Sequence, residues 1–208
     1  MGELRSFIFL DQLQPQTLCY MSTWMRGSLP RSNMAAQIIE VAPGLDIEAL
    51  TDIAVKHTSV KAGVLVVERQ FGYLEFHSRE TSEVKASAAA VLDALGASAG
   101  DATKPQILGS KVITRVDHQH AFLINRNKLG SMIIPGEALY TLEMQPASYA
   151  ILAANEAEKA ANIKIIDYRM IGANGRVYLA GSEAEIPSAR DAAETALRNL
   201  GADQDFAR

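Results

Sequence analysis

Three short stretches carry side chains that could do chemistry, and the strongest is an acid beside a base. Glu68 and Arg69 are adjacent within residues 66–72, between two β-rich runs. If several copies of this loop met around an axis, the arginines alone would repel one another, so a closed opening would need interleaved glutamates as bidentate partners. A loop that exchanges those ion pairs for water would act as a gate. The ordinary alternative is a surface ion pair worth less than about 1 kcal/mol.

The other two stretches give weaker signals. Asn125 and Arg126 could hold an anion, because a guanidinium offers a fork of donors and an amide adds another, but a solvated hairpin turn is the favoured interpretation. His118 and His120 have the spacing that puts two metal ligands on one face of a strand. This stretch is typical of a polar turn and no third ligand has matching spacing, so we expect no metal site and no cofactor.

No sequence motif predicts an enzyme. The chain lacks the nucleophile elbow Gly-x-Ser-x-Gly, the phosphate-binding P-loop and the dinucleotide-binding Gly-x-Gly-x-x-Gly pattern. The glycine-containing loop Gly172-Ala173-Asn174-Gly175-Arg176 is typical of a turn. A single cysteine, Cys19, cannot form an internal disulfide. An enzyme that uses the two histidines is therefore a distant alternative.

Composition excludes several classes of partner. With 208 residues and 48% apolar residues, the chain is long enough for one large domain or two of about 100 residues each. Its 20 basic and 24 acidic residues give a net charge of -4, which argues against nucleic acid or an anionic membrane surface as a partner. No apolar run approaches the roughly 20 residues that cross a bilayer. The amino terminus lacks the pattern of a signal peptide, so we expect a cytoplasmic protein.

The elements that position these residues occur twice. A shift of 103 residues pairs Gly27 with Gly130, Pro43 with Pro146 and Lys56 with Lys159. A two-residue slip near position 70 then pairs Tyr73 with Tyr178, Leu74 with Leu179 and Leu92 with Leu197. Glycine, proline and lysine matches in one register are harder to obtain by chance than alanine matches. We predict a tandem duplication with domains at 1–103 and 104–208, joined by the small polar segment 98–105.

Each copy shows the same order of elements. The first copy is predicted to have strands at 7–10, 18–24, 37–41, 63–67 and 73–77, with helices at 45–58 and 84–95. The second is predicted to have strands at 112–114, 121–124, 140–144, 163–167 and 176–180, with helices at 147–161 and 189–200. Because the strands do not alternate strictly with helices, the pattern predicts an α+β fold with helices packed on a mostly antiparallel sheet.

Five separated motifs carry a resemblance to a known family. They are Glu3-Leu4-Arg5-Ser6 with Leu10 to Gln16, Thr51 to Lys56, Val67-Glu68-Arg69, Leu123 to Arg126, and Ala153 to Lys159. In this order they resemble the tandem-domain carboxysome shell proteins, which are gated, trimeric pseudohexamers built from two circularly permuted bacterial-microcompartment (BMC) domains. The resemblance covers residues 3–201.

The resemblance implies a structural shell protein rather than an enzyme. It implies a homotrimer, which can stack as a dimer of trimers and packs beside other microcompartment shell proteins in the cytoplasm. The adjacent Glu68 and Arg69 match the pore gate, and Gly172 to Arg176 match the second-domain pore loop, where Asn174 replaces the aromatic residue usual in relatives. Lys56 and Lys159 match the lysines at the edges of the pseudohexameric tiles, where neighbouring tiles pack side by side. The cargo implied is small anionic metabolites such as phosphorylated sugars.

A soluble trimeric ligand-binding regulator with the same α+β fold is the alternative of a different class. Such a regulator would bind a metabolite in a cleft between subunits and would not form flat sheets with other proteins.

Overall fold

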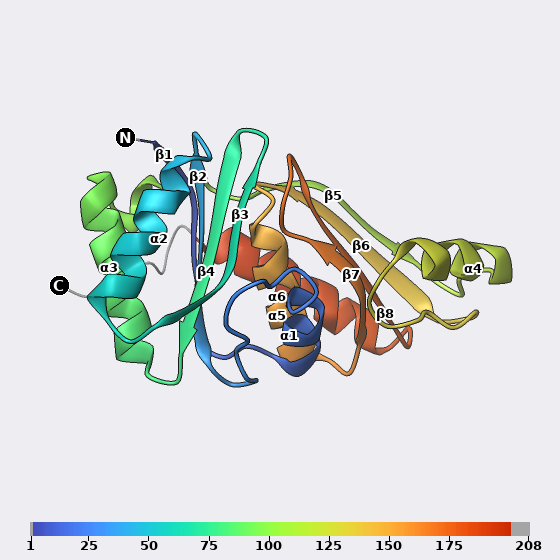
Figure 1. Cartoon of the computed structure of the whole chain (residues 1–208). Coiled ribbons are helices and arrows are strands. Elements are labelled where there is room, and N and C mark those ends of the chain that lie inside the picture. The colour runs from blue at the N-terminus through green and yellow to red at the C-terminus, as the bar shows by residue number, and fades with distance from the viewer. Residues whose placement is uncertain (1, 201–208) are drawn as a thin grey trace. The chain divides into compact units, whose positions relative to one another are not determined.

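The computed structural model describes residues 2–200, and these form two compact units, 2–104 and 105–200. Each unit contains one four-stranded antiparallel sheet with helices. The order of strands and α-helices along the chain is the same in both, and a short 3-10 helix follows the last α-helix of the first unit (Figure 1). The end of the second predicted domain, residues 201–208, lies outside the described residues. The architecture is therefore the α+β fold that the sequence predicts.

Unit 1 has the strand order β1-β2-β4-β3, with neighbouring strands antiparallel. Its elements are β1 (Glu3–Leu10), α1 (Pro15–Met21), β2 (Ala35–Ala42), α2 (Asp46–His57), β3 (Lys61–Glu68), β4 (Phe71–Ser78), α3 (Thr81–Leu95) and the 3-10 helix η1 (Ala99–Asp101). Helix α3 ends at Gly96, which takes the left-handed conformation with a φ of 66° that glycine adopts without strain.

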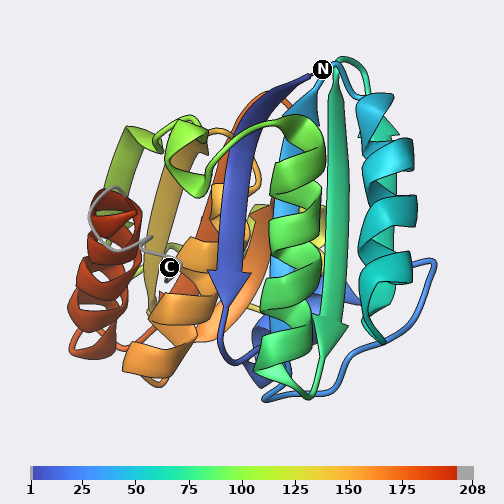
Figure 2. The same ribbon diagram turned by 90° about the vertical axis from the view of Figure 1, so that its left-hand side faces the viewer.

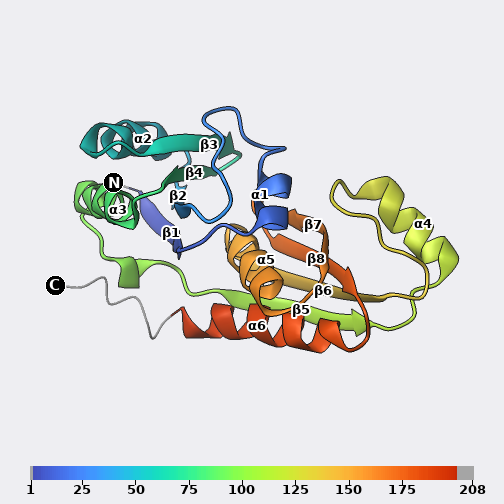
Figure 3. The same cartoon turned by 90° about the horizontal axis from the view of Figure 1, so that it is seen from below.

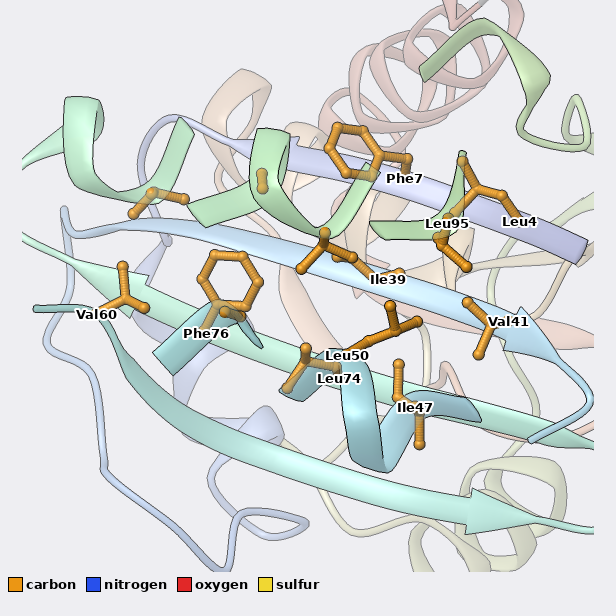
Figure 4. Packing of buried hydrophobic residues seen from close by; sticks show 14 of the residues in the cluster. Leu4, Phe7, Ile39, Val41, Ile47, Leu50, Val60, Leu74, Phe76 and Leu95 are labelled. Atoms are coloured by element: carbon orange, nitrogen blue, oxygen red, sulfur yellow. The ribbon is translucent and has the colours of Figure 1, made fainter. Parts of the chain in front are cut away.

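The core of unit 1 lies between its sheet and the helices α2 and α3, which run along one face (Figure 2). Ile39 of β2 with Leu74 and Phe76 of β4 points into this layer (Figure 4). Ile47 and Leu50 of α2 meet them from the helical side. The alternation of apolar residues along the strands and the spacing of three and four along the helices thus bury one face of each element.

Unit 2 repeats the arrangement with the strand order β5-β6-β8-β7. Its elements are β5 (Gln106–Ile113), α4 (His118–Asn127), β6 (Ala138–Gln145), α5 (Tyr149–Ala160), β7 (Lys164–Arg169), β8 (Gly175–Gly181) and α6 (Glu185–Asn199). Figure 3 shows α5 and α6 side by side and α4 apart from them. None of the helices within residues 2–200 has both the length and the apolar character needed to span a membrane.

The predicted strands at 18–24 and 121–124 are wrong, because both stretches lie largely in helices, α1 and α4. Pro15 occupies the first turn of α1, where its missing N–H costs nothing. The side chain of Asp117 caps α4 by accepting a hydrogen bond of 2.8 Å from the backbone N–H of Gln119. Both helices are short, so their apolar residues alone did not distinguish a helix from a strand.

The position of the slip between the two copies is also corrected. In the sheets Gly72 opposes Val41 and Gly175 opposes Met144, so β4 and β8 keep the 103-residue register. Tyr73 therefore corresponds to Arg176 and not to Tyr178. Both glycines are required by close approach, because a Cβ on either would collide with a backbone carbonyl oxygen. The register changes only after β4 and β8, where α3 starts at 81 and α6 at 185.

Candidate functional site

The β3–β4 hairpin of unit 1 presents Glu68 and Arg69 at its tip (Figure 1). Glu68 pairs with Phe71 across the ladder, so the loop consists of Arg69 and Gln70 alone. Arg69 has a φ of 56°, whereas Gln70 is not in the left-handed region. This pattern matches the type II′ hairpin turn, whose first loop position usually holds glycine. An arginine there costs about 1 kcal/mol.

The two gate side chains form a loose, exposed ion pair. Nε of Arg69 lies 3.7 Å from Oε1 of Glu68, which is longer than a hydrogen bond. The Arg69 side chain is 87% exposed and the Glu68 side chain 49% exposed. A pair this exposed contributes little to folding, so both groups can exchange it for other partners at small cost.

The base of this hairpin, in contrast, is held firmly. The guanidinium of Arg5 lies 4.1 Å from the centroid of the Phe71 ring, and its Nε donates a hydrogen bond of 2.8 Å to Oε1 of the fully buried Glu40. The stacked and ion-paired arginine thus fixes the first residue after the loop. Sequence reasoning identified Arg5 only as part of a motif and missed Glu40 and Phe71. The recurrence of the glutamate as Glu143 was the available signal.

The corresponding loop of unit 2, residues 170–174, is built differently. Nδ2 of Asn174 donates a hydrogen bond of 3.0 Å to Oε1 of Glu143, and Oδ1 accepts one from Gln145. Arg176 donates to the same glutamate oxygen from Nε at 3.0 Å and Nη2 at 2.9 Å. The hydrogen bond from Asn174, followed by those from Arg176, lowers the pKa of Glu143.

The residues of the predicted second pore loop therefore fall into two groups in the structure, those held against or within the sheet and those at the tip. Asn174 and Arg176 are turned back onto β6, and Gly175 begins β8. The part that remains at the tip consists of small residues, Gly172 with a φ of 127° and the exposed Ala173. Sequence reasoning missed Glu143 and Gln145, because their contacts with the loop join residues about 30 positions apart. The unit 2 loop lacks at its tip the charge pair that unit 1 presents.

The two predicted edge lysines lie at equivalent positions, in the last turns of α2 and α5. Nζ of Lys56 lies 2.6 Å from Oδ2 of Asp52, and Nζ of Lys159 lies 2.8 Å from Oε1 of Glu156. Cations at helix carboxyl ends interact favourably with the helix dipole. The ammonium of Lys56 is exposed and can reach a neighbouring molecule, which remains a prediction.

The two residues of the candidate anion contact both lie in a helix. Asn125 and Arg126 lie in the last turn of α4 and not in a hairpin turn. The Asn125 amide is occupied by the backbone of Ile133, donating to its oxygen and accepting from its nitrogen, both at 2.9 Å. The Arg126 guanidinium lies 5.6 Å from the centroid of the Phe122 ring. The Asn125 amide is thus engaged within unit 2, and an anion contact at Arg126 stays a prediction.

The histidine pair has no shared face. His118 and His120 lie in the first turn of α4, where positions two apart point in different directions. Throughout residues 2–200, no group of three or more histidine, cysteine, aspartate or glutamate side chains is arranged to hold a metal ion.

A groove of 510 Å³ lies in unit 1, between α2 and the end of α3. Leu50, Ile53 and Leu95 line it, and Asp46 is the single titratable side chain among its lining residues. Binding sites for small molecules combine apolar walls with several convergent polar groups. This groove has apolar walls without several convergent polar groups, so it is not a typical small-molecule site. The cleft between subunits that a ligand-binding regulator would use is a separate prediction.

Comparison with known protein families matches both halves of the chain. The model of the CsoS1D N-terminal domain matches residues 4–101, and the BMC domain model matches residues 138–204. The carboxysome shell protein CcmP of Synechococcus elongatus is 46% identical over 95% of this chain and 93% of its own length. The carboxysome shell protein CsoS1D of Prochlorococcus marinus is 45% identical, over 95% of this chain and 78% of its own length.

Two solved structures are similar along nearly the whole chain. The fused permuted hexameric shell protein MSM0275 of the RMM microcompartment is 67% identical, with a TM-score of 0.94 over 96% of this chain and 98% of that chain. The double-ringed trimeric shell protein MSM0271 of the same compartment is 41% identical, with a TM-score of 0.92 over 95% and 97% of the two chains. Sequence and fold therefore agree across both units.

Proposed function

Because the chain belongs to the family of carboxysome shell proteins with tandem BMC domains, we propose that it forms a homotrimeric tile with a central pore gated by Glu68 and Arg69. Membership of this family makes it a structural protein of a carboxysome-type microcompartment shell in the cytoplasm, and not an enzyme. The trimer, the gate and the cargo are the parts that we propose.

The observation that carries the gate is the β3–β4 hairpin tip. An acid and a base stand there side by side, exposed and only loosely paired, while Phe71 behind them is clamped by Arg5. The arginine occupies a backbone position that favours glycine. Local folding alone would not select an arginine there, so a role outside the monomer accounts for it.

Around a threefold axis, three copies of this pair would give two states. In the closed state each Arg69 would bind the Glu68 of a neighbour, which removes the repulsion among three guanidinium groups. In the open state the pairs would separate and the side chains would turn into water, which costs little because they are already solvated. Stacking of two trimers would enclose a chamber between two such gates.

The charge of the open gate favours small anions. Three arginines facing one opening attract phosphorylated metabolites, such as phosphorylated sugars, and the nearby glutamates limit how tightly such an anion binds. The small tip residues of the unit 2 loop, Gly172 and Ala173, would add width without charge.

The test is the passage of anions through the assembled tile, measured as single-channel conductance in a planar lipid bilayer with phosphoglycerate as the main anion. Wild-type protein should switch between two conductance levels, whereas a Glu68→Ala, Arg69→Ala variant should remain at one. The matched control replaces Arg79 and Glu80, an exposed acid–base pair just beyond the other end of β4, and should switch like the wild type. Unchanged switching in the Glu68, Arg69 variant would refute the gate.

The relatives point to two compartments. CcmP and CsoS1D are carboxysome shell proteins, while MSM0275 belongs to the RMM microcompartment and is more similar to this chain, 67% against 46% identity for CcmP. We propose that the partners are the other shell proteins of the compartment that the host builds. Isolation of intact shells from the host, followed by mass spectrometry of the enclosed enzymes, identifies that compartment.

A further inference from the structure

The second strand of each sheet carries a glutamate at the same position of the repeat, Glu40 in β2 and Glu143 in β6. Both glutamates lie beside the start of the following strand of the sheet, because Glu40 pairs with Tyr73 of β4 and Glu143 pairs with Arg176 of β8. The loops that we place at the pore lead directly into these two strands. Two equivalent acids therefore lie at the bases of the two loops.

Each glutamate holds the end of its loop by a different kind of contact. In unit 1, Glu40 accepts a hydrogen bond of 2.8 Å from Nε of Arg5, and Cζ of this arginine lies 4.1 Å from the centroid of the Phe71 ring. In unit 2, Glu143 accepts a hydrogen bond of 3.0 Å directly from Asn174, which is the counterpart of Phe71. The anchoring acid is thus the same, while the last link is a stacked cation in unit 1 and a hydrogen bond in unit 2.

The two kinds of link tolerate movement to different degrees. A cation attracts an aromatic face within about 6 Å of the ring centroid, so a ring can shift beneath a guanidinium and keep the contact. A hydrogen bond weakens steeply when its angle falls below about 120°. The Asn174 amide is held by two such bonds, one to Glu143 and one from Gln145. Phe71 therefore has room to move that Asn174 lacks.

The residue after each of these positions is a glycine that is fixed by close packing. A Cβ on Gly72 would lie 2.3 Å from the carbonyl oxygen of Gly44, and a Cβ on Gly175 would lie 2.4 Å from that of Ala147. Movement of either loop relative to its sheet is therefore confined to the loop side of these glycines. In unit 1 that side contains Phe71 and the two gate residues.

Neutralisation of the acid does not by itself explain the arginine at position 5. The equivalent position of unit 2 holds Leu108, and Glu143 receives its charged hydrogen bonds from Arg176 of the neighbouring strand β8. The arginine of unit 1 comes instead from β1, and its guanidinium reaches past β2 to the ring of Phe71 on β4. The aromatic ring and the arginine occur together in the unit that carries the gate residues, and both are missing from the other unit.

We infer that Arg5 is a positioning residue of the gate, which acts through the ring of Phe71 and lets the unit 1 hairpin move while the unit 2 loop stays fixed. The inference rests on the proposed gate and names the contact that regulates it. Closing requires Arg69 to reach the Glu68 of a neighbouring copy, whereas the exposed and loosely paired side chains of the single chain correspond to the open state. The contact between Arg5 and Phe71 therefore stabilises the open position of the hairpin.

Stepwise fluorination of the Phe71 ring tests this contact. Fluorine weakens the attraction of the ring face for a cation and nearly preserves the shape of the side chain. With phosphoglycerate as the main anion, the mean open dwell time in single-channel recordings should shorten several-fold from phenylalanine through monofluorinated to trifluorinated phenylalanine at this position. The matched control is Phe76, a core residue of the same strand with no cation over its ring among residues 2–200 (Figure 4). Its fluorination should leave the dwell times unchanged.

A second variant gives unit 1 the kind of link that unit 2 has. In Phe71→Asn the new amide occupies the position of Asn174 in the repeat and can donate to Glu40, while Arg5 remains as the cation. The hairpin should then be fixed, so the channel should stay at one conductance level although both gate residues are present. The fluorinated series, which preserves the shape of the side chain, decides the question if this variant does not assemble.

The outcomes separate this inference from the proposed function. A wild-type channel with a single conductance level would refute the gate itself. A wild type that switches, together with unchanged open dwell times in the series at Phe71, would overturn the role of Arg5 alone. Equal shortening at Phe71 and Phe76 would overturn it as well, because packing and not the cation would then account for the effect. Wild-type switching in Phe71→Asn would contradict the fixed link.

Discussion

Arg69 shows most clearly how a single residue can conflict with its local structure. Its φ of 56° places an arginine where glycine is favoured, at the first position of a two-residue hairpin loop. The sequence pattern identified Glu68 and Arg69 as the candidate gate, because adjacent opposite charges between two strands are visible in the sequence. It did not reveal the backbone strain, which depends on the length of the loop.

Replacing Arg69 with glycine should therefore stabilise the chain while removing the gate. We expect Arg69→Gly to raise the free energy of unfolding by about 1 kcal/mol, because glycine adopts this φ without steric cost. Arg69→Ala, which keeps the Cβ and the strain, should show no such gain. Urea unfolding of both variants measures the difference, and equal stabilities would refute the strained-turn account.

The contacts of Arg5 with Glu40 and Phe71 behind the hairpin lead to a second prediction about single residues. Arg5→Met removes both the hydrogen bond to the buried Glu40 and the stacking on Phe71. We expect a loss of about 1–3 kcal/mol in the free energy of unfolding, since a buried carboxylate loses its charged partner. Arg5→Lys keeps the charge without the planar guanidinium and should lose less. If thermal unfolding showed Arg5→Lys to be less stable than Arg5→Met, the stabilising role of the Arg5 guanidinium would be wrong.

Helices and strands were predictable where their periodicity was long and unbroken. The predicted helices 45–58 and 84–95 match α2 and α3, because apolar residues recur there every three or four positions without internal glycine or proline. Helices α1 and α4 were missed because seven and ten residues give too few repeats of the period. The misplaced slip came from a chance Tyr-Leu match in β4 and β8.

Contacts distant in sequence were beyond prediction for the same reason. Glu40 and Arg5 are 35 positions apart, and Asn174 and Glu143 are 31 apart. No local pattern links such residues, and the pairing of strands alone brings them together. The hydrogen bonds that join Asn174 to β6 follow from that pairing, while its place in a pore loop stays a prediction.

Strand β4 carries a buried acid that should make stability depend on pH. Burial raises the pKa of Glu75 above its ordinary 4.5, although the hydrogen bond and charge of His77, whose Nδ1 lies 2.8 Å from Oε1, lower it. The folded state thus holds this proton more tightly than the unfolded state. Its contribution to stability is complete below about pH 4.5 and is lost as the pH rises through the raised pKa.

A Glu75→Gln variant cannot titrate at this position. Its free energy of unfolding relative to wild type should therefore increase as the pH rises from about 4 towards 7. Glu80→Gln, at an exposed glutamate just beyond the end of β4, should show no such trend. Chemical unfolding at several pH values and one fixed protein concentration measures both, and a constant difference for Glu75→Gln would contradict the raised pKa.

At the scale of the whole molecule, the chain contains two units of the same fold, each with its own four-stranded antiparallel sheet. The composition and the repeat predicted two similar domains. They did not predict how copies of the chain associate, because association depends on the shape and charge of whole surfaces and not on local periodicity.

Contacts between tiles are a separate step from formation of the trimer. Lys56 is exposed near the end of α2, and we expect Lys56→Asp to leave the trimer intact while preventing flat sheets. Electron microscopy of purified protein shows sheets directly, and native mass spectrometry checks the trimer. The matched control, Lys61→Asp, changes an exposed lysine at the start of β3 to the same residue. If the Lys56→Asp protein formed normal sheets, Lys56 would not take part in the contact between tiles.

The central claim is that three copies of the chain place the Glu68–Arg69 hairpin around one axis. A cryo-electron microscopy reconstruction of the purified assembly tests it most directly. We predict a ring of three chains with Glu68 and Arg69 of every copy lining the central opening. A ring with this hairpin on its outer rim, or particles without a threefold axis, would contradict the account.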